Sequence, residues 1–320
     1  MISPLLLHYI VIAGLVFLPA LGVGIGQGFL GRSIFEACDR QPAEQDEIQK
    51  TMFILFGVLE MGIIFGLVMA VSILFNWQVC NYYDACAELG IFAALAFPAF
   101  MTGITAAFPA REGLIAMVRQ PFFAKKIMNF MILILVVMQT PVVFGFLVGF
   151  IIRTKIILGV PSAAAAAQLV ASGISIGIGS LGPSIGMAFL ARNSCCAIGT
   201  NKQSYDKVFT LTLFGQAFME ASIIFSLLVS FMLLVSYPFV LVDHPWSFVL
   251  PLAVSLAIAI GTVGPGISLG RVSAAACKQV AEHPSLYNAL FRMNFMALGI
   301  IEASVLYAFI ISMRLYINIT

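Results

Sequence analysis

Eight long stretches of apolar residues, separated by short polar segments, run along the chain. They cover roughly residues 5–35, 50–76, 88–115, 126–152, 163–198, 206–236, 247–278 and 288–316. A helix needs about 20 apolar residues to cross a bilayer, so each stretch predicts one transmembrane helix. Several stretches exceed the bilayer thickness, which predicts that these helices tilt or project into water. The pattern therefore predicts an all-α integral membrane protein with eight transmembrane helices.

The chain repeats itself four times. Offsets of 79, 160 and 242 residues place Glu60 on Gln139, Glu220 and Glu302. The repeats divide the chain into four tandem helical hairpins, at residues 1–80, 81–160, 161–241 and 242–320. Two spans per repeat give every hairpin the same orientation, whereas inverted-repeat transporters need an odd number of spans per repeat. Parallel hairpins suit a row or a ring.

The placement of positive charge predicts the topology. The chain has 16 Lys and Arg residues, and all but Arg153, Lys155 and Arg314 belong to the connections after the first, third, fifth and seventh spans. Cytoplasmic loops carry the excess of positive charge. We therefore expect these four polar loops in the cytoplasm and both termini outside. The expected location is the inner membrane of a bacterium.

Composition excludes a water-soluble globular protein. Hydrophobic residues make up 61% of the chain, charged residues 9%, and the mean hydropathy is +1.06. The N-terminal residues 1–22 lack the basic start of a signal peptide, so we expect them in the first mature helix. The cysteines show no metal-ligand spacing, and only Cys80 and Cys86 lie where a disulfide is a hypothesis worth stating.

Glutamates recur deep in the apolar stretches, at Glu60, Glu220 and Glu302, with Gln139 at the matching place in the second hairpin. An ionised carboxylate at the bilayer centre costs about 2.5–3.5 kcal/mol. Removal of water favours the neutral carboxylic acid, so each glutamate is expected to be protonated when it faces lipid. Use of the glutamates only as hydrogen-bonding links between helices would not need three matched copies. The pattern indicates an ion carrier.

Small residues mark the first helix of three hairpins at every second position. A spacing of two leaves two adjoining helix faces without bulk, which allows close approach of backbones on both sides. A tightly packed inner ring of helices needs such faces, although an ordinary helix bundle also uses small residues. The small residues are Gly22, Gly24, Gly26 and Gly28, then Gly182, Ser184, Gly186 and Ala188, and finally Gly264, Gly266, Ser268 and Gly270.

The polar loop of each hairpin also repeats. Proline after a polar pair ends one helix and fixes the turn before the next. The motif reads Arg40-Gln41-Pro42 and Arg119-Gln120-Pro121, and in altered form Glu282-His283-Pro284. The third hairpin has Thr200-Asn201-Lys202 at this place, without the proline.

Together these motifs resemble the rotor-ring proteolipid, or c subunit, of F-type ATP synthases. The resemblance rests on GVGIGQG at residues 22–28, RQP at 40–42, FGVLEMGIIFGL at 56–67, GQAFMEASIIFSLL at 215–228 and ALGIIEASVLYAF at 297–309. It covers nearly the whole chain, most specifically in the first, third and fourth hairpins. It implies that the hairpins form part of a membrane c-ring.

The resemblance also implies roles for particular residues. Glu60, Glu220 and Glu302 would carry one ion per step past an arginine of the a subunit of the stator. Gln27, Ser222, Ser304 and Tyr307 would support the ion sites. The central stalk would contact the loop residues Arg40, Gln41, Pro42, Arg119, Gln120, Pro121, His283 and Pro284. The other implied partners are further copies of the chain or other c hairpins, and the lipid bilayer.

The chain departs from the usual member of that family in two ways. Four fused hairpins are closer to the proteolipids of V-type ATPases. Gln139 replaces a carboxylate, and an amide exchanges no proton, so the second hairpin should carry no ion. Pro141 should bend its helix at that depth. Fewer ions per turn favour ATP-driven pumping over synthesis.

Protons are the expected ion. Sodium needs several oxygen ligands. The resemblance implies that these would come from a glutamine of the first helix, the glutamate and a serine or threonine beside it. The first hairpin has Gln27 but no hydroxyl beside Glu60, whereas Ser222 and Ser304 stand in hairpins that lack the glutamine. No copy assembles the full set, which makes sodium the less favoured ion.

Two other functional classes are weaker. A proteolipid oligomer that forms a pore or a membrane-packing complex without rotation is the main alternative. An enzyme has little support, because His8, His244 and His283 lie away from the glutamates and no nucleophile–base pair or metal cluster is visible. We therefore expect no catalytic residue, no metal, no cofactor and no nucleic-acid partner.

Overall fold

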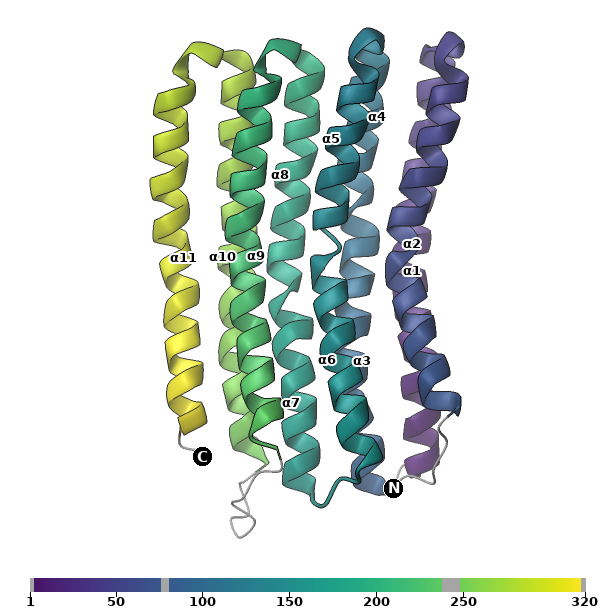
Figure 1. Ribbon diagram of the computed structural model, residues 1–320, viewed down its shortest axis with the longest axis vertical. Helices are drawn as coiled ribbons and strands as arrows, with labels where there is room; N and C mark the ends of the chain where they lie inside the picture. The colour runs from purple at the N-terminus through teal and green to yellow at the C-terminus, as the bar shows by residue number, and fades with distance from the viewer. Residues whose placement is uncertain (1–2, 76–80, 238–247, 318–320) are drawn as a thin grey trace.

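A computed structural model describes residues 3–75, 81–237 and 248–317 as a row of four upright helical hairpins (Figure 1). All four hairpin turns lie at one end of the row, called here the turn end, and both termini lie at the other, the terminal end. The described residues contain eight helical spans long and apolar enough to cross a membrane, as predicted. In order, the hairpins contain α1 (Pro4–Arg40) and α2 (Gln45–Phe75); α3 (Tyr82–Thr105), α4 (Ala107–Arg119), α5 (Ala124–Val137) and α6 (Thr140–Ile157); α7 (Ala163–Gly179), α8 (Leu181–Thr200) and α9 (Tyr205–Val235); and α10 (Val249–Glu282) and α11 (Tyr287–Ile317).

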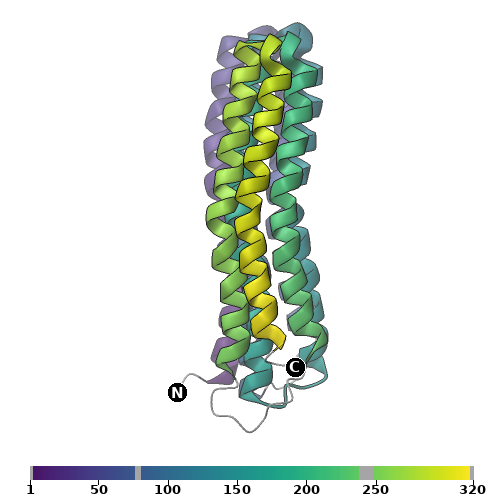
Figure 2. The ribbon, with the colours of Figure 1, turned by 90° about the vertical axis from the view of Figure 1, so that its left-hand side faces the viewer.

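The helices form two layers. The first helix of each hairpin, namely α1, α3–α4, α7–α8 and α10, contributes to one layer, and the second helices contribute to the other (Figures 1 and 2). The closest contacts between neighbouring hairpins lie within the first-helix layer. The second-helix layer is more widely spaced, so it exposes more side chain to the surroundings.

Glycines allow the first helices to touch through their backbones. A Cβ atom on Gly26 of α1 would meet the carbonyl oxygen of Gly103 in α3. In the same way, a Cβ on Gly186 of α8 would meet the carbonyl oxygen of Gly266 in α10. Side chains at these positions would separate the helices. Each of the first three hairpins therefore packs a face with glycine against the next hairpin along the row.

The first and the last hairpin of the row expose unlike faces. Gly24 and Gly28 on α1 are exposed and have no atom within 4 Å of a Cβ position, and the same holds for Gly264 on α10. By the repeat offsets, Gly24 is equivalent to Gly103 and Gly266, which are covered by the preceding hairpin. The free face of α1 therefore corresponds to the face that, inside the row, packs against the preceding hairpin. The free face of α10 corresponds to the face that packs against the following hairpin.

Three spans are interrupted near their middle. The interruptions follow Thr105, Val137 and Gly179, and each of these residues stands four positions before a proline, namely Pro109, Pro141 and Pro183. Proline lacks an N–H group and clashes with the carbonyl four residues earlier, which explains the positions of all three breaks. The bend at Pro141 was predicted, whereas the other two were not.

The turns interlock along the row. The side-chain amide of Gln120 donates to the carbonyl oxygen of Gly199 at 2.8 Å, and that of Asn201 donates to Ala281 at 2.9 Å. Gln41 makes a longer bond of the same kind, 3.3 Å, to Val118. The acceptors are carbonyls at the ends of the neighbouring first helices, which have no partner within their own helix. Each of the first three turns thus caps the next hairpin.

A buried ionic cluster joins three helices near the terminal end. The carboxylate of Glu88 on α3 is fully buried and lies 2.8 Å from Nδ1 of His8 on α1. Arg153 on α6, also buried, approaches the same carboxylate at 4.0 Å. Glu88 was not predicted from the sequence, because it stands alone near the start of an apolar stretch and has no equivalent in the other hairpins. The cluster links the first hairpin to the second.

The backbone contact of α8 with α10 predicts the effect of a single side chain. Gly186→Val should force these helices apart and lower stability by about 1–3 kcal/mol, the usual cost of overpacking. Thermal unfolding of the detergent-purified chain, followed by circular dichroism, measures the change. Gly24→Val is the matched control, because its side chain enters open space within the chain. Equal midpoints for the two variants would contradict the role of Gly186.

The ionic cluster predicts a second loss of stability. Glu88→Gln leaves His8 and Arg153 buried without their carboxylate, and the loss of one partner from a buried pair costs about 3–5 kcal/mol. Chemical unfolding of the purified chain should show the loss. Glu282→Gln serves as control, since its pair with Lys278 is solvent-exposed at the turn end and is expected to contribute less than about 1 kcal/mol. A Glu88 variant as stable as the control would show that the cluster does not hold the hairpins together.

Candidate functional site

The four matched positions all lie in the second-helix layer. Glu60 on α2 is exposed, and Glu220 on α9 and Glu302 on α11 are half-buried. Gln139, between α5 and α6, is only 2% exposed. Each hairpin holds one of the four residues, so the structure distributes them along the row and does not gather them into one cluster. A protein side chain that moved along the second-helix layer would meet these residues one at a time.

The Glu60 site lies within the first hairpin. The side-chain amide of Gln27 on α1 donates to Oε1 of Glu60 at 2.8 Å. The pair spans the two layers and holds the carboxyl near the first-helix layer. Ala106, Met187 and Leu269 occupy the position of Gln27 in the other hairpins, so none of these can provide the same contact.

The Glu220 site lies between the second and third hairpins. The hydroxyl oxygen of Thr140 on α6 is 3.0 Å from Oε1 of Glu220 on α9. Thr140 was not predicted as a site residue, although a hydroxyl next to both Gln139 and Pro141 was visible in the sequence. The contact is formed because the break between α5 and α6 places Thr140 at the first position of a new helix. The second hairpin, which has Gln139 in place of the matched glutamate, therefore contributes to the site of its neighbour.

The Glu302 site differs from both. Within the described parts of the chain, the carboxyl of Glu302 has no hydrogen-bond partner. The hydroxyl of Ser304 donates to the carbonyl oxygen of Ile301 in its own helix at 2.6 Å. Ser222 makes a longer contact of the same kind, 3.5 Å, to Phe218. Both hydroxyls predicted to support ion sites thus bond to their own helices, and Tyr307 is 67% exposed on α11.

Gln139 is in an unusual environment. Its amide nitrogen and oxygen are both buried, and neither has a hydrogen-bond partner among the described residues. The amide cannot exchange a proton, so this position offers no carrier group.

The turn residues divide into two groups. Arg40, Pro42, Arg119 and His283 are exposed at the turn end, where a second protein can reach them. Gln41 and Gln120 instead direct their amides to the neighbouring hairpin, as described above, and Pro121 and Pro284 are half-buried. The predicted disulfide between Cys80 and Cys86 involves a residue outside the described parts of the chain, so that hypothesis remains a prediction.

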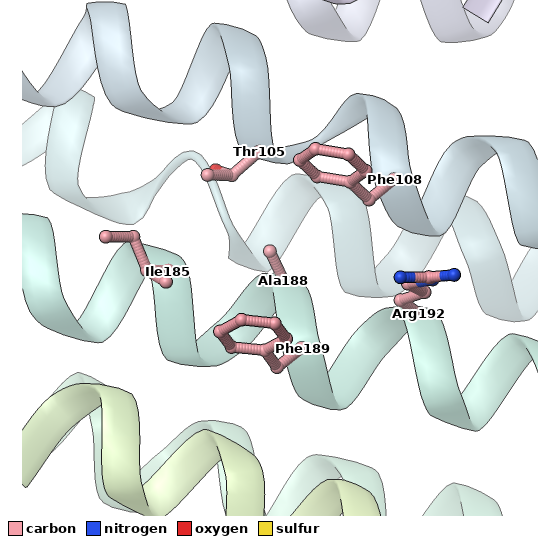
Figure 3. A pocket seen from close by; sticks show the side chains of 6 residues that line it. All are labelled: Thr105, Phe108, Ile185, Ala188, Phe189 and Arg192. Atoms are coloured by element: carbon pink, nitrogen blue, oxygen red, sulfur yellow. The ribbon is translucent and has the colours of Figure 1, made fainter.

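A mostly apolar cavity of about 170 Å³ opens between α4 and α8 (Figure 3). Phe108 and Phe189 lie on its two sides, and Arg192 lies at one end. Arg192 also forms an ion pair with Glu112 of α4 at 3.4 Å. The cavity contains none of the four matched positions, so it is separate from the glutamate sites.

Comparison with known proteins supports the interpretation based on the repeats. The family model for the C subunit of ATP synthase matches residues 11–73, 170–233 and 252–315, together more than half of the chain. These segments contain Glu60, Glu220 and Glu302, and the second hairpin lies outside them.

Individual c subunits match as well. The ATP synthase c subunit of Chloroflexus aurantiacus is 35% identical over 66 residues, which is 21% of this chain and 87% of that protein. That of Dehalococcoides mccartyi is 36% identical over 67 residues, 21% of this chain and 88% of that protein. That of Mycoplasma capricolum is 36% identical over 63 residues, 20% of this chain and 62% of that protein. Each of these small proteins corresponds to one hairpin. The chain therefore belongs to the family of ATP synthase c subunits, as a membrane proteolipid with tandem copies of the family's hairpin.

Proposed function

We propose that the chain is a proton-carrying rotor component of a rotary ATP synthase or ATPase. Glu60, Glu220 and Glu302 would each carry one proton past the a subunit of the stator as the rotor turns. The observation that carries this proposal is the repetition of one carboxyl at one position of the second-helix layer, where the chain leaves it exposed or half-buried. Membership of the family supports it.

The proposed cycle depends on lipid and water. A carboxyl that faces lipid is stable as the neutral acid, because the bilayer penalises the charged form. It releases its proton where the stator provides a water path and a positive group. Gln139 takes no part in this exchange. Three carriers in four hairpins move fewer ions per turn than four would, which favours ATP-driven pumping.

The ligand sets favour protons over sodium. Glu60 has one amide donor, Glu220 has one hydroxyl, and Glu302 has no hydrogen-bond partner among the described residues. Sodium requires several oxygen ligands around one ion. A proton needs only the carboxyl itself.

Further copies of the chain would complete the rotor. The free face of α1, with Gly24 and Gly28, fits the role that Gly103 fills inside the row, and the free face of α10, with Gly264, fits the role of Gly22. Two unlike faces that match each other produce head-to-tail contacts, which close into a ring when the angles allow it. The turn end, with Arg40 and Arg119 exposed, would face the cytoplasm and the central stalk, and both termini would lie outside the bacterial inner membrane.

Carbodiimide labelling tests the carriers. The reagent modifies protonated carboxyls in apolar surroundings, so mass spectrometry of native membranes should find it on Glu60, Glu220 and Glu302. Labelling should fade as the pH rises and should not respond to sodium, because the neutral acid is the reactive form. Glu47, exposed at the turn end, is the internal control and should stay unmodified. Absence of label on all three glutamates at every pH would overturn the proposal, and protection by sodium would replace the proton with that ion.

The free glycine faces predict where copies join. Gly264→Leu should leave the single chain folded, since its side chain enters open space, but it should prevent close contact with the next copy. Native mass spectrometry of the extracted complex should then show single chains or short oligomers in place of the full assembly. Gly57→Leu is the control, because Gly57 lies in the more widely spaced second-helix layer. An unchanged assembly for Gly264→Leu would show that copies join elsewhere.

A further inference from the structure

The second hairpin departs from the others at three consecutive residues. Gln139, Thr140 and Pro141 stand where the first hairpin has Glu60, Met61 and Gly62. The loss of the carboxylate explains only the first of these changes. The other two place a hydroxyl and a helix break beside the carrier of the next hairpin, and their geometry gives them a joint role.

Pro141 leaves one carbonyl without its helical partner. In a continuous helix, the N–H group of residue 141 would donate to the carbonyl oxygen of Val137, but proline has no N–H group. The hydroxyl oxygen of Thr140 lies 2.6 Å from that carbonyl oxygen. The same hydroxyl oxygen lies 3.0 Å from Oε1 of Glu220. Thr140 therefore stands between two acceptors.

A threonine hydroxyl has one hydrogen to donate and two lone pairs with which to accept. When Glu220 is ionised, Thr140 can serve only one acceptor, so either Val137 or the carboxylate lacks a donor. When Glu220 is protonated, its hydrogen can go to Thr140, and the hydrogen of Thr140 can go to Val137. Each polar group that links Val137, Thr140 and Glu220 is then satisfied. An acceptor without a donor is unfavourable at this depth, because the bilayer supplies no water in its place.

We infer that Thr140 and the Pro141 break form a hydroxyl relay that holds Glu220 in its neutral, proton-loaded form. The inference rests on the proposed function, in which Glu220 carries a proton. Thr140 acts here as a positioning residue. The second hairpin, which has no carrier, thus controls the carrier of the third hairpin. It keeps a role in the ion pathway although Gln139 replaces its glutamate.

The relay makes the three carriers unequal. Gln27 of its own hairpin contacts Glu60 through an amide. Ala221 occupies the position of Thr140 in the hairpin before Glu302, and Ala303 occupies it in the fourth hairpin. Neither alanine has a hydroxyl. Among the described residues, only the junction between the second and third hairpins has the hydroxyl, the freed carbonyl and the carboxyl together.

Charged groups near α9 do not replace the relay. Arg192 of α8 is paired with Glu112, and Arg271 of α10 is exposed and lies over the ring of Phe189 at 5.3 Å. α7 contains no Asp, Glu, Lys, Arg or His, and Glu302 of α11 is the carrier of the next hairpin. The remaining charged groups on the helices around Glu220 lie about 13 Å or more along their helix axes from the level of the carriers: Lys125, Lys126, Arg153, Lys155, Asp206, Lys207, Lys278, Glu282, Arg292 and Arg314.

The test is the pH profile of carbodiimide labelling at each glutamate in the assembled complex. Pro141→Ala restores an N–H group for Val137 and frees the hydrogen of Thr140 to donate to an ionised Glu220. The pH at which half of Glu220 is labelled should then fall by about one unit. Glu60 and Glu302 in the same chain should keep their profiles, and their labelling also reports that the variant is folded.

A double-mutant comparison separates the relay from straightening of the helix. In a Thr140→Val chain, the further change Pro141→Ala should no longer shift Glu220. Thr140→Ser keeps the hydroxyl and should retain the original profile.

Several outcomes would overturn the relay. One is a Pro141→Ala shift that persists without Thr140, and another is no shift at all. Labelling of Glu60 and Glu302 without Glu220 would refute the relay alone, whereas absence of label at all three glutamates would refute the proposed function as well.

Discussion

Backbone-to-backbone contact between first helices is the constraint on which the rest of the structure depends. In a bilayer, hydrophobic burial does not drive helices together, because lipid is as apolar as the side chains, so close packing must do so. Gly26 against Gly103, and Gly186 against Gly266, bring neighbouring first helices together without intervening side chains. The bulkier second helices cannot follow to the same distance. Their layer therefore stays open, and the matched glutamates occupy that open layer.

Where glycines do not hold neighbouring hairpins together, side chains of one hairpin donate hydrogen bonds to backbone carbonyls of the next. The amides of Gln120 and Asn201 cap carbonyls of the next hairpin. The carbonyl of Gly179, freed by Pro183, accepts a hydrogen bond from Thr262 of α10 at 2.8 Å. A proline in one helix thus creates an acceptor that a neighbouring helix uses. The same chemistry recurs at Val137 and Thr140, next to Glu220, and it is the basis of the relay proposed above.

The sequence predicted the elements better than their contacts. Apolar length gave the eight spans, and the repeat offsets gave the four hairpins and the matched glutamates. Proline alone did not predict the breaks, because Pro19, Pro98 and Pro265 stay inside continuous helices. Thr140 and Glu88 were missed for a related reason. Repeat offsets identify equivalent residues, but neither Thr140 nor Glu88 has an equivalent in the other hairpins, and each acts through a partner 80 positions away.

Covalent fusion of the four hairpins determines the symmetry of any assembly of these chains. Separate hairpins of one kind would give a rotation axis of the same order as the number of hairpins. Here the smallest repeating object is the whole chain, so the order of the axis falls to the number of chains. The position of Gln139 then recurs once per chain, at a fixed angle from the other hairpins of that chain. No variation in expression level can change this angle, because peptide bonds set the order of the hairpins.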